Sequence, residues 1–121
     1  MKFNLNQQDL QKSLNYCQGV IEKRSTLPIL SNVLLDASES KLTITATDLD
    51  LIFINKISNV EVLEEGKTTT SSSIMYDIVR KFSSGKKINF SNPSENKLHL
   101  ESEKSVFNLN CINASEFPLT D

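Results

Sequence analysis

The stretch KFNLNQQDLQKSLNYCQGVI, residues 2–21, decides the fold of this chain. It opens with alternating polar and apolar residues that place Phe3 and Leu5 on one side, as in a half-buried strand. Asn6 follows, and asparagine is a preferred N-cap because its side chain accepts a hydrogen bond from a free helix amide. Beyond it, apolar residues recur every three or four positions, at Leu10, Leu14, Cys17 and Ile21. The stretch therefore predicts a strand, a cap and an amphipathic helix in direct succession.

The same order returns at residues 67–82, KTTTSSSIMYDIVRKF. A Thr/Ser-rich strand is expected from Lys67 to Ser72, and Ser73 is placed to cap the helix that follows. The apolar stripe of this second helix consists of Ile74, Met75, Ile78, Val79 and Phe82. Three segments of period two follow each helix, the first three within residues 32–64 and the second three at 87–91, 97–101 and 106–112. The sequence therefore predicts the order βαβββ twice.

Two amphipathic helices and short antiparallel sheets can bury their apolar faces against each other in two layers. We therefore expect an α+β fold, and 121 residues suit a single domain over residues 1–121. The polar faces of both helices then lie on one side of the domain. They carry Gln7, Gln8, Gln11, Lys12, Asn15 and Gln18 in the first helix, and Asp77, Arg80, Lys81 and Ser84 in the second.

Composition narrows the class of protein. Hydrophobic residues make up 38% and charged residues 23%, which is ordinary globular usage, and no apolar run is long enough to span a bilayer. We expect neither a signal peptide nor a membrane span. Cys17 and Cys111 are isolated and are expected to be buried free thiols, which suits the cytoplasm. The net charge of −2 repels phosphate, so any contact with nucleic acid must rest on a local basic patch.

Candidate metal and catalytic groups are few. His99 is the single histidine, and neither cysteine has a ligand at zinc-like spacing, so we expect no metal and no cofactor. Asp48 and Asp50 suggest a cation or acid pair, but they are better explained as turn residues because no nucleophile or further carboxylate converges on them. A polymerase-like or nuclease-like fragment would need a carboxylate cluster for metal ions, which the sequence lacks. A strand-rich module that meets only protein is the other alternative.

Five motifs carry a resemblance to a known family. They are Met1-Lys2-Phe3, Thr26-Leu27-Pro28-Ile29-Leu30 followed by Asn32, Thr47-Asp48-Leu49, Asp77-Ile78 with Arg80, and Phe117-Pro118. In this order and at this spacing the chain resembles the bacterial DNA polymerase III beta sliding clamp, as the amino-terminal domain of the three similar domains in such a subunit. The fixed loop from Arg24 to Leu30 is the most specific part.

The resemblance implies a DNA clamp fold and a non-catalytic processivity factor. Two subunits join head to tail as a homodimer, and their six domains close a ring that encircles double-stranded DNA without reading its sequence. Helices line the hole and sheets form the outer wall. DNA polymerase III and the clamp loader would bind through the later domains, which this chain lacks.

The resemblance also assigns candidate DNA-contacting residues. Arg24 matches an arginine that touches duplex DNA in the family, and Lys12 and Arg80 match basic positions on the inner helices. Lys23 and Lys81 are basic neighbours without as clear a match. For each of these, the alternative is an ordinary solvated charge. Sparse basic residues among Gln and Asn fit loose contact with the DNA backbone.

A second set of residues is assigned to the subunit interface. Phe107 and Leu109 are two positions apart and so project from one face of a strand, where they match an apolar pair that packs across the subunit boundary. An ordinary core pair is the alternative. Ile74 stands where a family member carries a basic residue, so the resemblance brings no ion pair to this part of the interface. Lys97 and Lys104 are expected beside the same edge, with ion-pair partners in the third domain.

Overall fold

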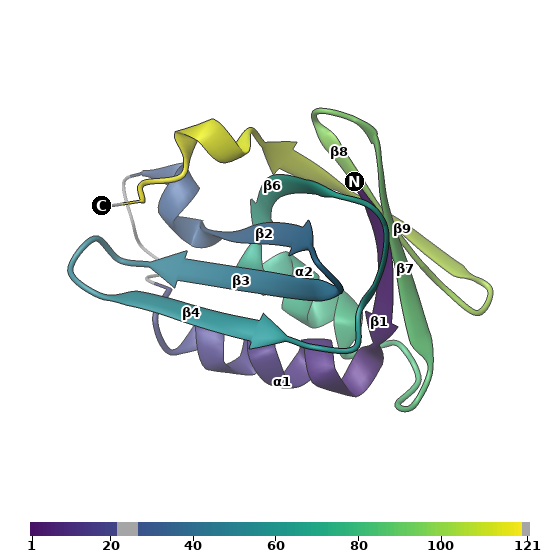
Figure 1. Cartoon of the computed structure of the whole chain (residues 1–121). Coiled ribbons are helices and arrows are strands. Elements are labelled where there is room, and N and C mark those ends of the chain that lie inside the picture. The colour runs from purple at the N-terminus through teal and green to yellow at the C-terminus, as the bar shows by residue number, and fades with distance from the viewer. Residues whose placement is uncertain (22–26, 120–121) are drawn as a thin grey trace.

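Two helices pack on one side of a nine-stranded antiparallel sheet in this computed structural model, which describes residues 1–21 and 27–119 (Figure 1). The elements are β1 (Lys2–Asn6), α1 (Gln7–Gln18), the short 3-10 helix η1 (Pro28–Ser31), β2 (Asn32–Ser38), β3 (Lys41–Thr47), β4 (Ile52–Ile57), β5 (Glu61–Glu64), β6 (Gly66–Ser71), α2 (Ser72–Val79), β7 (Lys87–Ser94), β8 (Lys97–Ser102), β9 (Ser105–Ile112) and the 3-10 helix η2 (Ala114–Glu116). The strand order is β4-β3-β2-β6-β9-β8-β7-β1-β5.

The two halves of the chain exchange their first strands. β1, which opens the first half, pairs with β7 of the second half over Lys2–Asn6 and residues 87–91. β6, which opens the second half, pairs with β2 of the first half over residues 66–71 and 32–37. The two sheets expected from the sequence are continuous, because β6 and β9 also pair at Thr69 with Ile112 and Thr70 with Cys111. The predicted βαβββ repeat is thus interlocked, and neither half has a complete sheet by itself.

The α+β class and the two helices are confirmed, and four details differ from the sequence prediction. The second helix ends at Val79 with Arg80 as its C-cap, so Lys81, Phe82 and Ser84 lie beyond it. Ser71, and not Ser73, caps α2, since its Oγ accepts a hydrogen bond from the Ile74 amide at 3.3 Å. A short additional strand, β5, pairs with β1. The first helix ends at Gln18, so Ile21 lies beyond it.

The core lies between the helices and the inner face of the sheet. α1 contributes Leu10, Leu14 and Cys17, and α2 contributes Met75 and Val79, all without measurable exposure. On the sheet side, the rings of Phe3 and Phe90 stack at 4.6 Å, which ties β1 to β7 in the centre of the core.

The helices lie antiparallel, as their contacts show. Gln7 at the start of α1 donates from Nε2 to the Val79 carbonyl at the end of α2, at 2.8 Å. At the other end, Ser72 Oγ donates to Gln18 Oε1 at 3.2 Å. Gln7 was expected on the polar helix surface, but it is 1% exposed because it bridges the two helices. Neither helix in the described residues approaches the length and apolarity that crossing a membrane requires.

Candidate nucleic-acid interface and subunit edge

A polar groove runs between the two helices on the side facing away from the sheet. Its lining consists of Gln7, Gln8, Gln11, Lys12, Asn15, Tyr76 and Ser84. Lys12 lies on the exposed side of α1, as predicted, and contributes the positive charge of this lining. Tyr76 spans the groove, since its hydroxyl donates to Asn15 Oδ1 at 3.1 Å. The groove offers hydrogen-bonding groups with little net charge.

Arg80 caps the C-terminus of α2 beside this groove. Its Nη2 lies 2.8 Å from Asp77 Oδ1, and its guanidinium carbon lies 4.8 Å from the centre of the Tyr76 ring. The ion pair is exposed on both sides, so it adds little stability, but it offsets part of the positive charge of Arg80. Lys81 follows, is exposed, and lines a separate hollow with Lys104. The structure thus brings Lys12 and Arg80 to the same helix layer.

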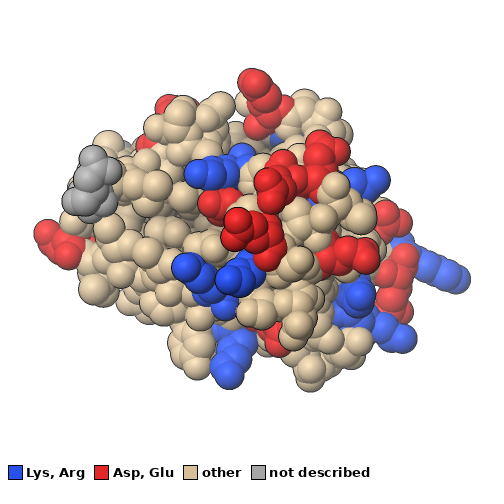
Figure 2. Space-filling model, viewed as in Figure 1, with Lys and Arg blue, Asp and Glu red and all other residues tan. Residues whose placement is uncertain are grey.

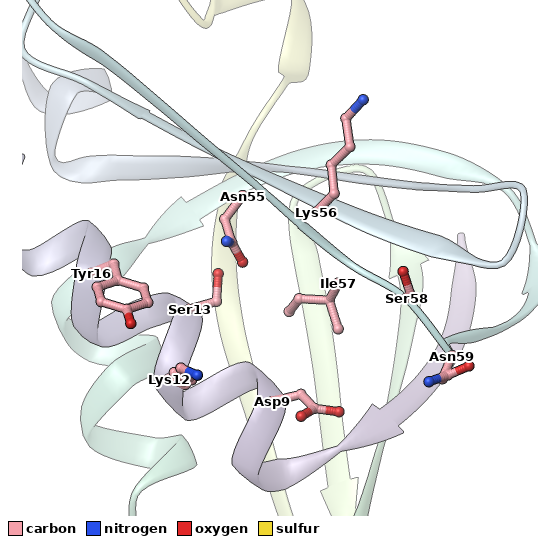
Figure 3. Close-up of a pocket in the computed structure, with 9 residues that line it drawn as sticks. All are labelled: Asp9, Lys12, Ser13, Tyr16, Asn55, Lys56, Ile57, Ser58 and Asn59. Atoms are coloured by element: carbon pink, nitrogen blue, oxygen red, sulfur yellow. The ribbon is translucent and has the colours of Figure 1, made fainter.

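A second groove lies between α1 and β4 (Figure 3). Asp9, Lys12, Ser13 and Tyr16 form its helix side, and residues 55–59 form its strand side. The amine of Lys56 points away from the helix (Figure 3). Lys12 lines both grooves and therefore lies between them. Ser13 Oγ is buried without a hydrogen-bond partner among the described residues.

Lys23 and Arg24 lie outside the described residues, and their assignment to DNA stays a prediction. Among the described residues that follow, Pro28 starts η1 and Leu30 is buried.

β9 has an open edge along most of its length. It pairs with β8 from Lys97–Asn110 to Ser102–Ser105, but its contact with β6 is limited to Cys111 and Ile112. The Cys111 amide donates to the Asn96 carbonyl, whereas the Asn110 carbonyl accepts from Thr70 on the opposite side. Because main-chain groups alternate along a strand, those of Asn108 and Val106 also point to the side opposite β8. No described strand pairs with them there.

The predicted interface residues occupy different positions at this edge. Leu109 is 7% exposed and belongs to the core, and Phe107 is half-buried with its ring 5.6 Å from that of Phe82. Ile74, by contrast, is 52% exposed. Ile74 and Leu109 together line a small, largely apolar hollow whose other walls are Asn32, Thr70, Ser71, Asn110, Cys111 and Ile112. The sequence pattern had placed Ile74 in the core stripe of α2, and its exposure corrects that prediction.

The two lysines expected near this edge lie on different surfaces. Lys97 Nζ donates to Asn110 Oδ1 at 2.6 Å across the β8–β9 pair, on the sheet face opposite Leu98 and Leu109. Lys104 lies in the exposed turn between β8 and β9. Lys97 therefore lies beside the end of β9 that pairs with β6, Lys104 lies at the opposite end of β9, and neither forms an ion pair within the described residues.

The remaining chemical features are the surface charge, the two buried thiols and the possible metal ligands. Figure 2, which views the sheet side, shows acidic side chains gathered near the centre with basic ones between and around them. Burial raises the pKa of the Cys17 thiol to about 12. It also raises the pKa of Cys111, against the opposing effects of a Thr68 hydrogen bond and Lys97. No group of three or more His, Cys, Asp or Glu side chains suited to a metal ion occurs in residues 1–21 and 27–119.

β4 forms a second open edge, which the sequence interpretation did not recognise. It is an end strand of the sheet, and exposed apolar residues gather on it and the turn before it: Leu49, Leu51, Ile52 and Ile54. The signal was present in the sequence, because both faces of this strand are apolar. The other end strand, β5, begins with Glu61 and ends with Glu64, and these charges discourage pairing with another strand.

Interlocked βαβββ halves with two helices on one side and open strand edges define the class as a DNA clamp domain, and comparison with solved structures agrees. A Caulobacter crescentus polymerase III beta structure superposes with a TM-score of 0.94 at 35% identity, over 100% of this chain and 32% of that one. The polymerase III beta subunit of Pseudomonas aeruginosa gives 0.94 at 30% identity, over 100% and 32%.

Sequence comparison identifies the family. The model for the DNA polymerase III beta subunit, N-terminal domain, matches residues 1–121, and the chain belongs to this family. The beta sliding clamp of Caulobacter vibrioides is 36% identical over 98% of this chain and 32% of its own length. The chain thus spans about a third of the length of the curated relatives it matches.

Proposed function

We propose that this chain is the amino-terminal domain, residues 1–121, of a three-domain sliding clamp subunit. In this role it is a non-catalytic processivity factor: a head-to-tail homodimer encircles double-stranded DNA and tethers the replicative polymerase in the cytoplasm. The polymerase and the clamp loader bind through later domains. The observation that carries the proposal is that one domain combines a polar helix layer with two open strand edges, on β9 and β4.

Open edges support a ring because each domain of a ring must join two neighbours. β9 offers free main-chain groups at Val106 and Asn108 beside the hollow at Ile74, which suits the addition of a strand from another subunit. β4 offers an apolar edge that suits a neighbouring domain of the same subunit. Both edges expose apolar side chains or unpaired main-chain groups in the single domain, and neighbouring domains would cover them in a ring.

The helix layer supports DNA on the inside of the ring. Lys12 and Arg80 supply modest positive charge, Lys81 follows Arg80 in the chain, and polar amides line the groove between the helices. Lys23 and Arg24 are proposed to add to this charge. Such a surface makes backbone contacts without reading bases, which permits sliding.

Retention of the full-length protein after loading on nicked circular DNA, compared with the same DNA cut to a free-ended linear form, tests the proposal. We expect long retention on the circle and rapid loss from the linear form, because a closed ring leaves only over an end. Equal retention on both would contradict topological clamping and favour ordinary surface binding. A module that meets only protein would be retained on neither, while its β9 edge would still pair.

A further inference from the structure

We infer that the groove between α1 and α2 is a phosphate-contacting site made mainly of neutral hydrogen-bond donors, Gln11 and Asn15, whose orientation is fixed by Gln7 and Tyr76. The inference rests on the proposed function and identifies the chemistry of its DNA contact. It concerns single backbone phosphates of duplex DNA.

The orientation of Gln11 follows from a buried main-chain carbonyl. The Val79 carbonyl can only accept, so Gln7 must turn its amide nitrogen towards it, at 2.8 Å. The same nitrogen donates to Gln11 Oε1 at 2.7 Å. Gln11 therefore uses its oxygen inside the protein, which leaves its own NH2 group for the groove.

Asn15 is oriented in the same sense one turn further along α1. Its Oδ1 accepts from the Tyr76 hydroxyl at 3.1 Å, so its NH2 group is likewise available to the groove. Gln11, Lys12 and Asn15 lie on one side of the helix, since positions three and four apart are neighbours. The Lys12 amine and the Ser84 hydroxyl complete the set of donors. Arg80 lies over the Tyr76 ring at the margin.

The carboxylates near this surface are engaged or lie elsewhere. Asp77 is paired with Arg80, and Asp9 lines the other groove, beside β4. Gln7 Oε1 is buried in the wall and has no hydrogen-bond partner among the described residues. The groove as a whole thus presents donors to an anion.

Neutral donors leave a distinct signature in salt dependence. A cation that contacts a phosphate releases a counterion and adds about 0.9 to the slope of log affinity against log salt, whereas a neutral amide adds nothing. Loss of Gln11 or Asn15 contacts should therefore lower affinity at every salt concentration alike. Loss of Lys12 should change the slope.

The test follows the side-chain NH2 signals of Gln11 and Asn15 by NMR as duplex DNA is added to the 121-residue chain at low salt. Two duplexes of unrelated sequence and inorganic phosphate are the probes. We expect both signals to shift with a saturating curve that is the same for the two duplexes. Tyr76→Phe keeps the ring under Arg80 but frees Asn15, and should weaken binding about two- to tenfold, the range of one neutral hydrogen bond, with an unchanged salt slope.

Asn15→Asp removes the donor and should weaken binding by at least the same factor, whereas Asn89→Asp, the same charge change on an exposed site of the sheet, should have little effect. Because Tyr76 acts through Asn15, the double variant Tyr76→Phe/Asn15→Asp should bind no worse than Asn15→Asp alone. A purely structural role of Tyr76 would instead give additive losses.

The outcomes separate the inference from the proposed function. The inference would be overturned if DNA shifted the signals of Lys12 and Arg80 but not the side-chain NH2 signals of Gln11 and Asn15, and if Tyr76→Phe did not change the affinity. Contact between DNA and the helix layer would still stand in that case. Signals that move with inorganic phosphate but not with duplex DNA would overturn the assignment to DNA. If no α1 or α2 signal moves with DNA, both the inference and the helix-layer role are wrong.

Discussion

Replacing Ile74 by serine should separate the subunit interface from the stability of the domain. Ile74 is exposed by 52% in the single domain, although it borders the apolar hollow beside β9. Isoleucine and serine have similar helix propensities, and the Ile74 amide keeps its bond to Ser71. About half of the side chain is buried in the domain already, so we expect the free energy of unfolding of the domain to fall by no more than about 0.8–1.5 kcal/mol, half of the 1.5–3 kcal/mol for full burial.

The effect on assembly follows from the area still to be buried. Full burial of an isoleucine side chain contributes about 1.5–3 kcal/mol, and roughly half of Ile74 remains exposed before assembly, so each interface should gain about 0.8–1.5 kcal/mol from it. A head-to-tail dimer contains this interface twice. The variant should therefore lose about 1.5–3 kcal/mol in total, which raises the dimer dissociation constant by roughly 10- to 150-fold.

Sedimentation of the full-length protein on dilution measures this constant. Leu63→Ser is the matched control, because Leu63 is 61% exposed on β5, away from the β9 edge. The interface interpretation would be refuted by a dilution profile for Ile74→Ser that coincides with that of Leu63→Ser. A loss of stability in the isolated domain larger than its buried half accounts for would instead show that Ile74 acts mainly as a core residue.

Three further predictions concern the core, the thiols and the helix layer. Leu109→Ala should lower the free energy of unfolding by about 2–5 kcal/mol in chemical denaturation, because Leu109 is a buried core residue and not only an interface residue. A loss smaller than this range would contradict its core role. The raised pKa of Cys17 keeps the folded thiol neutral, so its stabilising effect is complete below the unfolded pKa of 9.0 and is lost by about 1.4 kcal/mol per pH unit between there and about 12. Denaturant midpoints at several pH values should show this slope, and Cys17→Ala should flatten it. Asp77→Asn releases Arg80 and should raise DNA affinity and the salt slope, measured by titration at several salt concentrations, whereas Asp36→Asn, which releases Lys67 on the sheet, should leave the slope unchanged.

The helices and most strands were predictable because each has a clear period. Asn6 and the apolar residues after it gave α1 its correct start, and the Asn6 side chain does accept from the Gln8 amide. The cap of α2 was misplaced because Ser71, Ser72 and Ser73 are chemically equivalent in sequence, and only the geometry of the strand before them selects Ser71. β5 was missed because its charged residues resemble a loop.

Which strands pair with each other could not be predicted from the sequence, for a different reason. A period shows which face of a strand is buried but not which strand lies beside it, so the exchange of β1 and β6 between the halves left no local signal. The burial of Gln7 has the same cause, because its partner Val79 is 72 residues away. For the site, the exposed positions of Lys12 and Arg80 followed from helix spacing. The contact between Tyr76 and Asn15 did not, because it joins two helices whose relative placement the sequence leaves open.

The modest charge of the helix layer is what the proposed sliding role requires. In the inferred site, a neutral hydrogen bond from Gln11 or Asn15 to phosphate would replace one from water, with a net contribution of about 0.5–1.5 kcal/mol, roughly one to two and a half times thermal energy. Such contacts break and re-form as the duplex moves by one phosphate, so they orient DNA without holding it. Charge-assisted bonds are roughly twice as strong, and a layer of arginines in their place would add several such barriers to every step. The pairing of Arg80 with Asp77 acts in the same direction, because it removes part of the strongest phosphate-binding group on α2.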